Sequence, residues 1–140
     1  MNIKDSQSTA SKNKEIISKA FDEVNNGKPE AFLNIMDENF KLTIIGSTPL
    51  SGMHVGLQDV WENLISPITN ALEVQPTIVI DQLVAEGDVV VVKAHGEGGI
   101  AKNGKEYNNT YCHFMCLKDG KLVESTEYVD TELTRSALEK

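Results

Sequence analysis

The hydrophobic pattern at the start of the chain has the period of an α-helix. Apolar residues recur three or four positions apart between residues 16 and 24, and Gly27 follows them as a helix stop. Pro29 suits the first turn of a second helix, whose apolar positions continue to Met36. The pattern therefore predicts two consecutive helices near the N-terminus.

A third helical stripe follows a short β-rich segment at residues 40–45 and a loop of Gly, Ser and Pro at 46–52. Its apolar positions lie within residues 60–72 and include Trp61, which faces inward by periodicity, as a core residue or as a ligand platform. Pro67 removes one backbone hydrogen bond in this stretch, so we expect a kink or break near residues 63–66.

From residue 77 the pattern changes to that of β-strands. Residues 77–85 and 89–95 flank a Gly-containing turn, and further glycines at 96–99 interrupt the pairing. Asp119-Gly120 joins the last two strands, because both residues of a tight hairpin turn must tolerate positive φ.

Helices precede strands in this order rather than alternating with them, which is typical of an α+β fold. We expect a cone in which three helices pack on a strongly bent, mostly antiparallel sheet, with a short helix at 133–138. Residues 1–12 are polar and predict a flexible tail, and residues 13–140 predict a single domain.

The last hairpin places polar and aromatic groups on one surface. If Lys118 pairs with Lys121, alternation along the strands gives one shared face. Its cross-strand pairs are Asn109 with Asp130, Tyr111 with Tyr128, and His113 with Thr126, joined by Tyr107 and Met115. Titratable groups among aromatic rings line ligand cavities, so the sequence predicts a pocket here.

Asp130 and His113 are the candidate catalytic residues on this surface. A desolvated Asp130 carboxyl has a raised pKa and exchanges protons near neutral pH, although the same residue also suits a cap for a helix starting at Thr131. His113 is an acid, a base or an oxyanion donor, or a half-buried histidine satisfied by a neighbour. Asn109, Tyr111, Tyr128 and Met115 are candidate substrate contacts, and the two tyrosines also form a stabilising cross-strand pair.

Composition limits the partners. The 140 residues carry 13 Lys and Arg against 21 Asp and Glu, a net charge of −8, which opposes nucleic acid and anionic membrane surfaces. No secretory signal or membrane-spanning run is visible, and Cys112 and Cys116 lie about 13 Å apart along one strand, too far for a disulfide. These features predict a cytoplasmic protein. The histidine spacing predicts no metal site, and no phosphate loop or nucleotide-binding fingerprint predicts a bound cofactor.

The opposite face of the last hairpin is apolar. It is expected to carry Thr110, Cys112, Phe114, Cys116, Val123 and Val129. An apolar patch of this size is larger than those that monomeric proteins normally expose to solvent, so we expect a homodimer through the outer face of the sheet.

The chain resembles the SnoaL-like branch of the nuclear transport factor 2-like superfamily, which includes ketosteroid isomerases and polyketide cyclases. The resemblance covers residues 14–138. It rests on Asn25-Asn-Gly27, the loop Gly46-Ser-Thr-Pro-Leu-Ser-Gly52 with Gly56 after it, Asn103-Gly104, and the segment from Asp119 to Thr131. It implies the cone fold, and sheet-to-sheet homodimers are common in such families.

The resemblance also places the ketosteroid isomerase roles on this chain. The tyrosine that donates to the enolate falls at Ala20, the general-base aspartate near Thr43, and the protonated aspartate at His113. Steroid isomerisation by that mechanism is therefore not expected, and Thr43 remains a candidate substrate contact.

Three functional hypotheses follow. The first is a cofactor-independent acid–base enzyme of isomerase, cyclase or hydrolase type acting on a small, mostly apolar molecule. The second is a non-catalytic binder of such a molecule, and the third is a dimeric scaffold whose cavity its own side chains fill.

Overall fold

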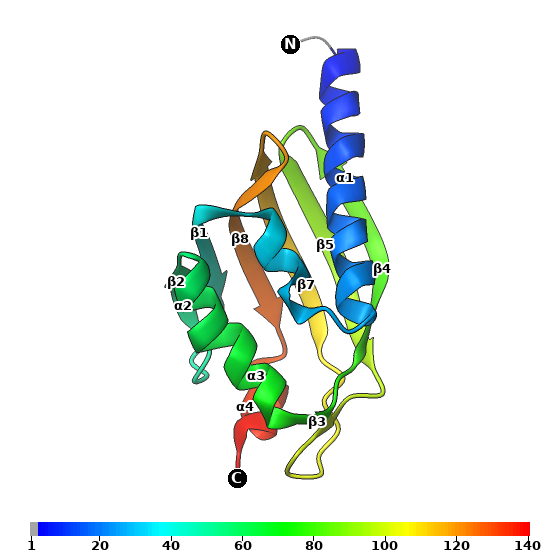
Figure 1. The fold of residues 1–140 in the computed structure, drawn as a ribbon. Coiled ribbons are helices and arrows are strands. Elements are labelled where there is room, and N and C mark those ends of the chain that lie inside the picture. Colours follow the sequence, from blue (N-terminus) through cyan, green and yellow to red (C-terminus); the bar gives the residue numbers. More distant parts are fainter. Residues whose placement is uncertain (1–2) are drawn as a thin grey trace.

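A bent six-stranded sheet, covered on one face by helices, forms the body of the protein (Figure 1). The computed structural model describes residues 3–140. The strand order is β2-β1-β8-β7-β5-β4, and a separate two-stranded sheet pairs β3 with β6. The helical elements are α1 (Ile3–Asn25), the 3₁₀ helix η1 (Pro29–Ile35), α2 (Leu57–Val60), the π-helix η2 (Trp61–Ile65), α3 (Ser66–Ala71) and α4 (Thr131–Leu138). The strands are β1 (Met36–Ile44), β2 (Gly52–Val55), β3 (Leu72–Val74), β4 (Thr77–Glu86), β5 (Val89–Glu97), β6 (Ile100–Ala101), β7 (Thr110–Lys118) and β8 (Lys121–Val129). The α+β prediction is confirmed.

The first helix lies across β4 and β5 and buries its apolar stripe against them. Ile17 and Phe21 are buried, as helical spacing requires. The Asn25 side chain fixes the end of the helix to the sheet, since it donates to the Ile78 carbonyl and accepts from the Ile78 amide, each at 2.8 Å. The expected tail differs: residues 3–12 belong to α1, and residues 1–2 lie outside the described part of the chain.

The third predicted helix is divided into α2, η2 and α3. Pro67 lies in the first turn of α3, where its missing N–H costs least, and the π-helix directly precedes it. The helical backbone is continuous across residues 57–71, and its π-helical irregularity at residues 61–65 overlaps the stretch where the sequence predicted a kink or break.

The sheet is mostly antiparallel, but β1 runs parallel to β8. Residues 46–51 form the predicted loop, and β2, which the sequence did not predict, begins at Gly52 and pairs with the end of β1. In this parallel pair Leu42 of β1 lies beside Ser125 of β8.

The final hairpin turns at Asp119-Gly120 as predicted, with both φ angles positive and Lys118 opposite Lys121. The predicted register beyond the turn is wrong by one residue. Leu117 pairs with Leu122, but Cys116 pairs with Glu124, so Val123 is an extra residue in β8. This β-bulge reverses the face of every later β8 side chain, because strand side chains alternate.

The main core lies between the sheet and α1. Its largest fully buried apolar side chains are Phe40, Ile17, Leu117, Leu122, Val60, Val90 and Val92. None of the helices in residues 3–140 is both long and apolar enough to cross a membrane.

Candidate functional site

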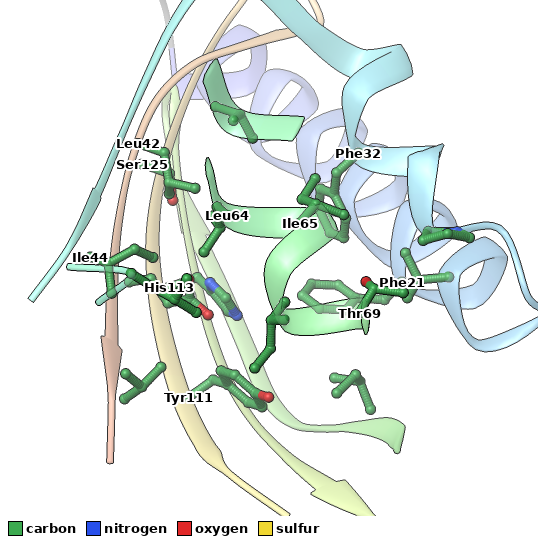
Figure 2. Close-up of a pocket in the computed structure, with 18 of the residues that line it drawn as sticks. Phe21, Phe32, Leu42, Ile44, Leu64, Ile65, Thr69, Tyr111, His113 and Ser125 are labelled. Atoms are coloured by element: carbon green, nitrogen blue, oxygen red, sulfur yellow. The ribbon is translucent and has the colours of Figure 1, made fainter. Parts of the chain in front are cut away.

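A cavity of about 430 Å³ lies between the inner face of the sheet and the helices. Its volume is in the range of small-molecule sites, about 300–1,000 Å³. Most of its lining is apolar and comes from α1, η1, η2, α3 and the strands β1, β7 and β8. Figure 2 shows Tyr111 and His113 extending from the sheet toward the helix side, where Phe21, Phe32 and Ile65 lie.

His113, on β7, lies on the cavity wall among aromatic rings. Its ring stacks on Tyr111 with centroids 5.5 Å apart and an angle of 10°, and lies 5.8 Å from the ring of Phe21. Burial lowers the pKa of His113 to about 4, because the cationic form loses its hydration. The imidazole is therefore neutral at pH 7 and has one donor and one acceptor nitrogen.

Glu127, on β8, is the cross-strand partner of His113. It lines the cavity and is half-buried. Burial raises the pKa of the Glu127 carboxyl to about 7, because the carboxylate is poorly solvated there. Both protonation states are thus populated near neutral pH.

Sequence reasoning missed Glu127 because the unshifted register turns it outward. One signal was present: the same register places the charged Glu124 beside Met115 on the buried face. In the structure Glu124 is exposed and Ser125 lies opposite Met115. A charge predicted to face the core was the indication that β8 contains an extra residue.

Tyr111 and Met115 lie on the cavity wall, as the alternation along β7 predicts. Burial, with a smaller contribution from Tyr107, raises the pKa of Tyr111 above its ordinary value. Its hydroxyl therefore remains protonated and available as a hydrogen-bond donor.

Ser125 lies two residues before Glu127 on the same face of β8. Its side chain is buried, with 2% of its surface exposed, and lines the cavity. Its Oγ has no hydrogen-bond partner among the residues that the structure describes. A buried hydroxyl without a partner is uncommon in native proteins.

Asp130 does not lie in the cavity. Its side chain is exposed and caps α4, since Oδ1 accepts hydrogen bonds from the amides of Glu132 at 3.1 Å and Leu133 at 3.2 Å. The bulge in β8 and the start of α4 together account for this position. The expectation of a desolvated Asp130 carboxyl on the inner face is wrong, and the capping alternative describes the geometry.

Asn109 is fully buried but joins backbone segments instead of lining the cavity. Its Nδ2 donates to Thr134 Oγ1 at 3.0 Å and to the Asp130 carbonyl at 3.3 Å. Its Oδ1 accepts from the amides of Thr110 at 2.8 Å and Asp130 at 3.0 Å. Asn109 therefore holds the start of β7 to the junction of β8 and α4.

Three other candidate contacts also lie away from the cavity lining. Tyr128 is 50% exposed on the outer face, because the bulge reverses its direction. Trp61 is 39% exposed, since the π-helix changes the helical periodicity around it. Thr43 is half-buried between Leu42 and Ile44, two of the β1 residues that line the cavity.

Within residues 3–140, no cluster of three or more His, Cys, Asp or Glu side chains has the arrangement of a metal site. The polar side chains that strands β7 and β8 contribute to the cavity wall are those of Tyr111, His113, Ser125 and Glu127. Together they offer proton exchange and hydrogen bonding inside an apolar enclosure.

The fold is shared with several solved structures. An NTF2-like protein from Burkholderia xenovorans LB400 is 22% identical, with 93% of this chain and 98% of that chain covered and a TM-score of 0.70. TerC, co-crystallised with polyporic acid, is 20% identical, with coverage of 92% and 99% and a TM-score of 0.77. An epoxide hydrolase of M. tuberculosis, described as LEH-like, is 12% identical, with coverage of 92% and 90% and a TM-score of 0.69.

At the level of sequence, no curated protein matches the chain. The family model of the SnoaL-like domain matches residues 17–125, which span α1, η1 and the strands through most of β8. The matched segment includes His113 and Ser125 on the cavity wall. The chain belongs to the SnoaL-like domain family, within the NTF2-like fold.

Proposed function

We propose that the protein binds a small, mostly apolar molecule in the cavity and transfers a proton on it without a cofactor. The observation that carries this proposal is the position of the Glu127 carboxyl in an apolar cavity, where burial raises its pKa to about 7. The family supports the proposal only broadly, because its fold hosts several chemistries.

Glu127 is the group that moves the proton. An acid–base group works best when its pKa lies near the working pH, and such a group contributes roughly 10²–10⁴ to a rate. Glu127 takes a proton from the ligand as a carboxylate and returns it as a carboxylic acid. Its position opposite His113 places both groups against the same part of a bound molecule.

His113 and Tyr111 stabilise negative charge that develops on the ligand. The neutral imidazole has one N–H, and the protonated Tyr111 hydroxyl is a second donor on the same wall. Donors fixed in an enclosure of low polarity stabilise an oxyanion more than they do in water. Their stacking, at 5.5 Å between ring centroids, restricts how far either ring can turn away.

The test uses 5-nitrobenzisoxazole, a probe that reports a base in an apolar cavity. A base removes the proton on its ring carbon, and the released electron pair breaks the N–O bond to give a coloured cyanophenolate. We expect turnover that rises with pH through an apparent pKa near 7 and falls about 100-fold or more in Glu127→Gln.

Glu124→Gln is the matched control, because Glu124 lies on the same strand but faces solvent. It should retain the wild-type rate. Equal rates in the Glu127 and Glu124 variants, or a Glu127 carboxyl that titrates near 4 by NMR, would contradict the proposed role.

A non-catalytic binder is the second candidate function. The volume of the cavity and the unpartnered Ser125 hydroxyl favour ligand binding whether or not chemistry follows. Binding of an apolar alcohol without Glu127-dependent turnover of 5-nitrobenzisoxazole would select this candidate.

A homodimer through the outer face of the sheet is also proposed. Val84, Phe114 and Tyr128 expose 47–50% of their surfaces there, on three strands of one sheet. Val129, expected in this stripe, lines the cavity instead because of the bulge. Light scattering should give a dimer mass that Phe114→Glu reduces to that of a monomer, and a monomeric wild type at micromolar concentration would refute the dimer.

A further inference from the structure

The Ser125 hydroxyl is a buried polar group that the fold itself does not satisfy. Its Oγ is enclosed, it lines the cavity, and it has no partner among the described residues. Native folds normally pair such groups with protein atoms or water. A ligand atom in the cavity is the partner that this geometry leaves available.

The neighbours of Ser125 explain why the protein supplies no partner. Leu42 lies beside it on β1, and Met115 lies opposite it on β7. Figure 2 shows Ser125 next to Leu42 on the sheet side of the cavity. Glu127, the next residue on the same face of β8, lies about 7 Å further along the strand. The hydroxyl therefore has apolar neighbours on both adjacent strands and lies two residues before the proposed proton-transfer group on β8.

The charge of the cavity restricts the ligand. None of the described residues that line it is Lys or Arg, and the chain as a whole carries a net charge of −8. An anionic ligand group at Ser125 would lose its hydration and find no cation. An uncharged hydroxyl can both donate to and accept from Ser125 at far lower desolvation cost.

We infer that Ser125 forms a subsite for one uncharged hydroxyl group of the ligand, whose apolar rings fill the space toward Phe21. The inference rests on the proposed function for the use of the cavity as a ligand site. Ser125 is then a positioning residue, because a ligand anchored there presents its neighbouring carbon atoms to Glu127. The ligand class is an uncharged, ring-containing alcohol or phenol.

The test compares four probes of one shape: 2-naphthalenemethanol, 2-methylnaphthalene, 2-naphthoate and 2-naphthylmethylammonium. Their affinities are measured by calorimetry at about pH 6, where the Glu127 carboxyl and the His113 ring are both mostly uncharged. We expect the alcohol to bind about tenfold more tightly than 2-methylnaphthalene, as one satisfied hydrogen bond allows. The carboxylate and the ammonium should bind more weakly than the alcohol.

Ser125→Ala should remove the tenfold preference for the alcohol and leave the affinity for 2-methylnaphthalene unchanged or higher. Thr126→Val is the matched control, since it removes the hydroxyl of the next residue, which points to the other face of the sheet. This control should keep the preference. Because Ser125→Ala removes one atom, the variant is expected to fold.

Three outcomes would overturn the inference: a preference that survives in Ser125→Ala, tighter binding of either charged probe, or no binding of any probe to the wild type. These outcomes are distinct from failure of the proposed function. A wild type without the alcohol preference, or a preference that survives in Ser125→Ala, overturns only the Ser125 subsite when Glu127-dependent turnover of 5-nitrobenzisoxazole is intact. Equal turnover by wild type and Glu127→Gln overturns the acid–base role while the binding comparison still reports on Ser125.

Discussion

The pH dependence of folding provides a direct test of Glu127 and His113, the cross-strand pair that lines the cavity. Burial raises the pKa of Glu127 from 4.5 to about 7 and lowers that of His113 from 6.5 to about 4. A tenfold change in proton affinity is worth about 1.4 kcal/mol, so each group contributes about 3 kcal/mol of pH-dependent stability.

The two contributions have opposite signs. The folded state holds the proton on Glu127 more tightly than the unfolded chain does, so this contribution is present below pH 4.5 and is lost as pH rises toward 7. The unfolded chain binds the proton on His113 more tightly, so that contribution is present above pH 6.5 and is lost as pH falls toward 4. Between pH 4.5 and 6.5 the two slopes cancel.

Single substitutions should reveal how the stability contribution of each group depends on pH. In Glu127→Gln the free energy of unfolding should gain about 3 kcal/mol relative to wild type between pH 4.5 and pH 7, because the penalty for ionising the carboxyl is gone. In His113→Phe, which keeps an aromatic ring against Tyr111, the stability relative to wild type should rise by a similar amount as pH falls from 6.5 to 4.

The assay is urea denaturation of the wild type and both variants at intervals between pH 4 and pH 8. Differences from wild type isolate the two groups, since other carboxylates titrate alike in all three proteins. Glu124→Gln is the control and should run parallel to wild type. If the Glu127→Gln difference stays constant across this range, the carboxyl is not desolvated and the reasoning from burial is wrong.

Three further substitutions test individual contacts. Ser125→Ala should raise the stability of the ligand-free protein by about 1 kcal/mol in calorimetry, because it removes an unpartnered buried hydroxyl; a lower melting temperature would contradict this. Asn109→Ala should lower the free energy of unfolding by about 3 kcal/mol in urea denaturation, because it removes the hydrogen bonds to the Asp130 amide and the Thr134 hydroxyl, and a loss below about 1 kcal/mol would refute the linking role. Asp130→Ala should lower the free energy of unfolding by about 1 kcal/mol, because the helix cap is lost, and should leave turnover of 5-nitrobenzisoxazole unchanged. Loss of turnover in a folded variant would show that Asp130 has a role in catalysis.

The sequence predicted the inner face of β7 correctly, because that strand continues without irregularity from the hairpin turn. Tyr111, His113 and Met115 therefore line the cavity as their alternation requires. The Asp119-Gly120 turn and the helical irregularity before Pro67 were also predictable, since both depend on local backbone chemistry. Local rules were sufficient wherever the feature itself was local.

The inner face of β8 was not predictable by alternation alone. Ser125, Glu127 and Val129 are no more apolar as a set than Thr126, Tyr128 and Asp130, so neither face stands out in the sequence. Which face of β8 points inward depends on packing at the start of the strand, next to the hairpin turn. There Leu122 must lie against Leu117 while Glu124 must reach solvent. Only an extra residue at Val123 satisfies both requirements.

The same bulge gives the cavity its chemistry. It brings Ser125 and Glu127 inward together, and each is costly there: one lacks a hydrogen-bond partner and the other lacks solvent for its charge. Two such costs on adjacent positions of one strand face would be removed most simply by apolar side chains, as at Val129. A ligand hydroxyl at Ser125 and a transferable proton at Glu127 would each offset this cost, so the presence of both groups on one strand face supports the proposed binding and proton-transfer roles.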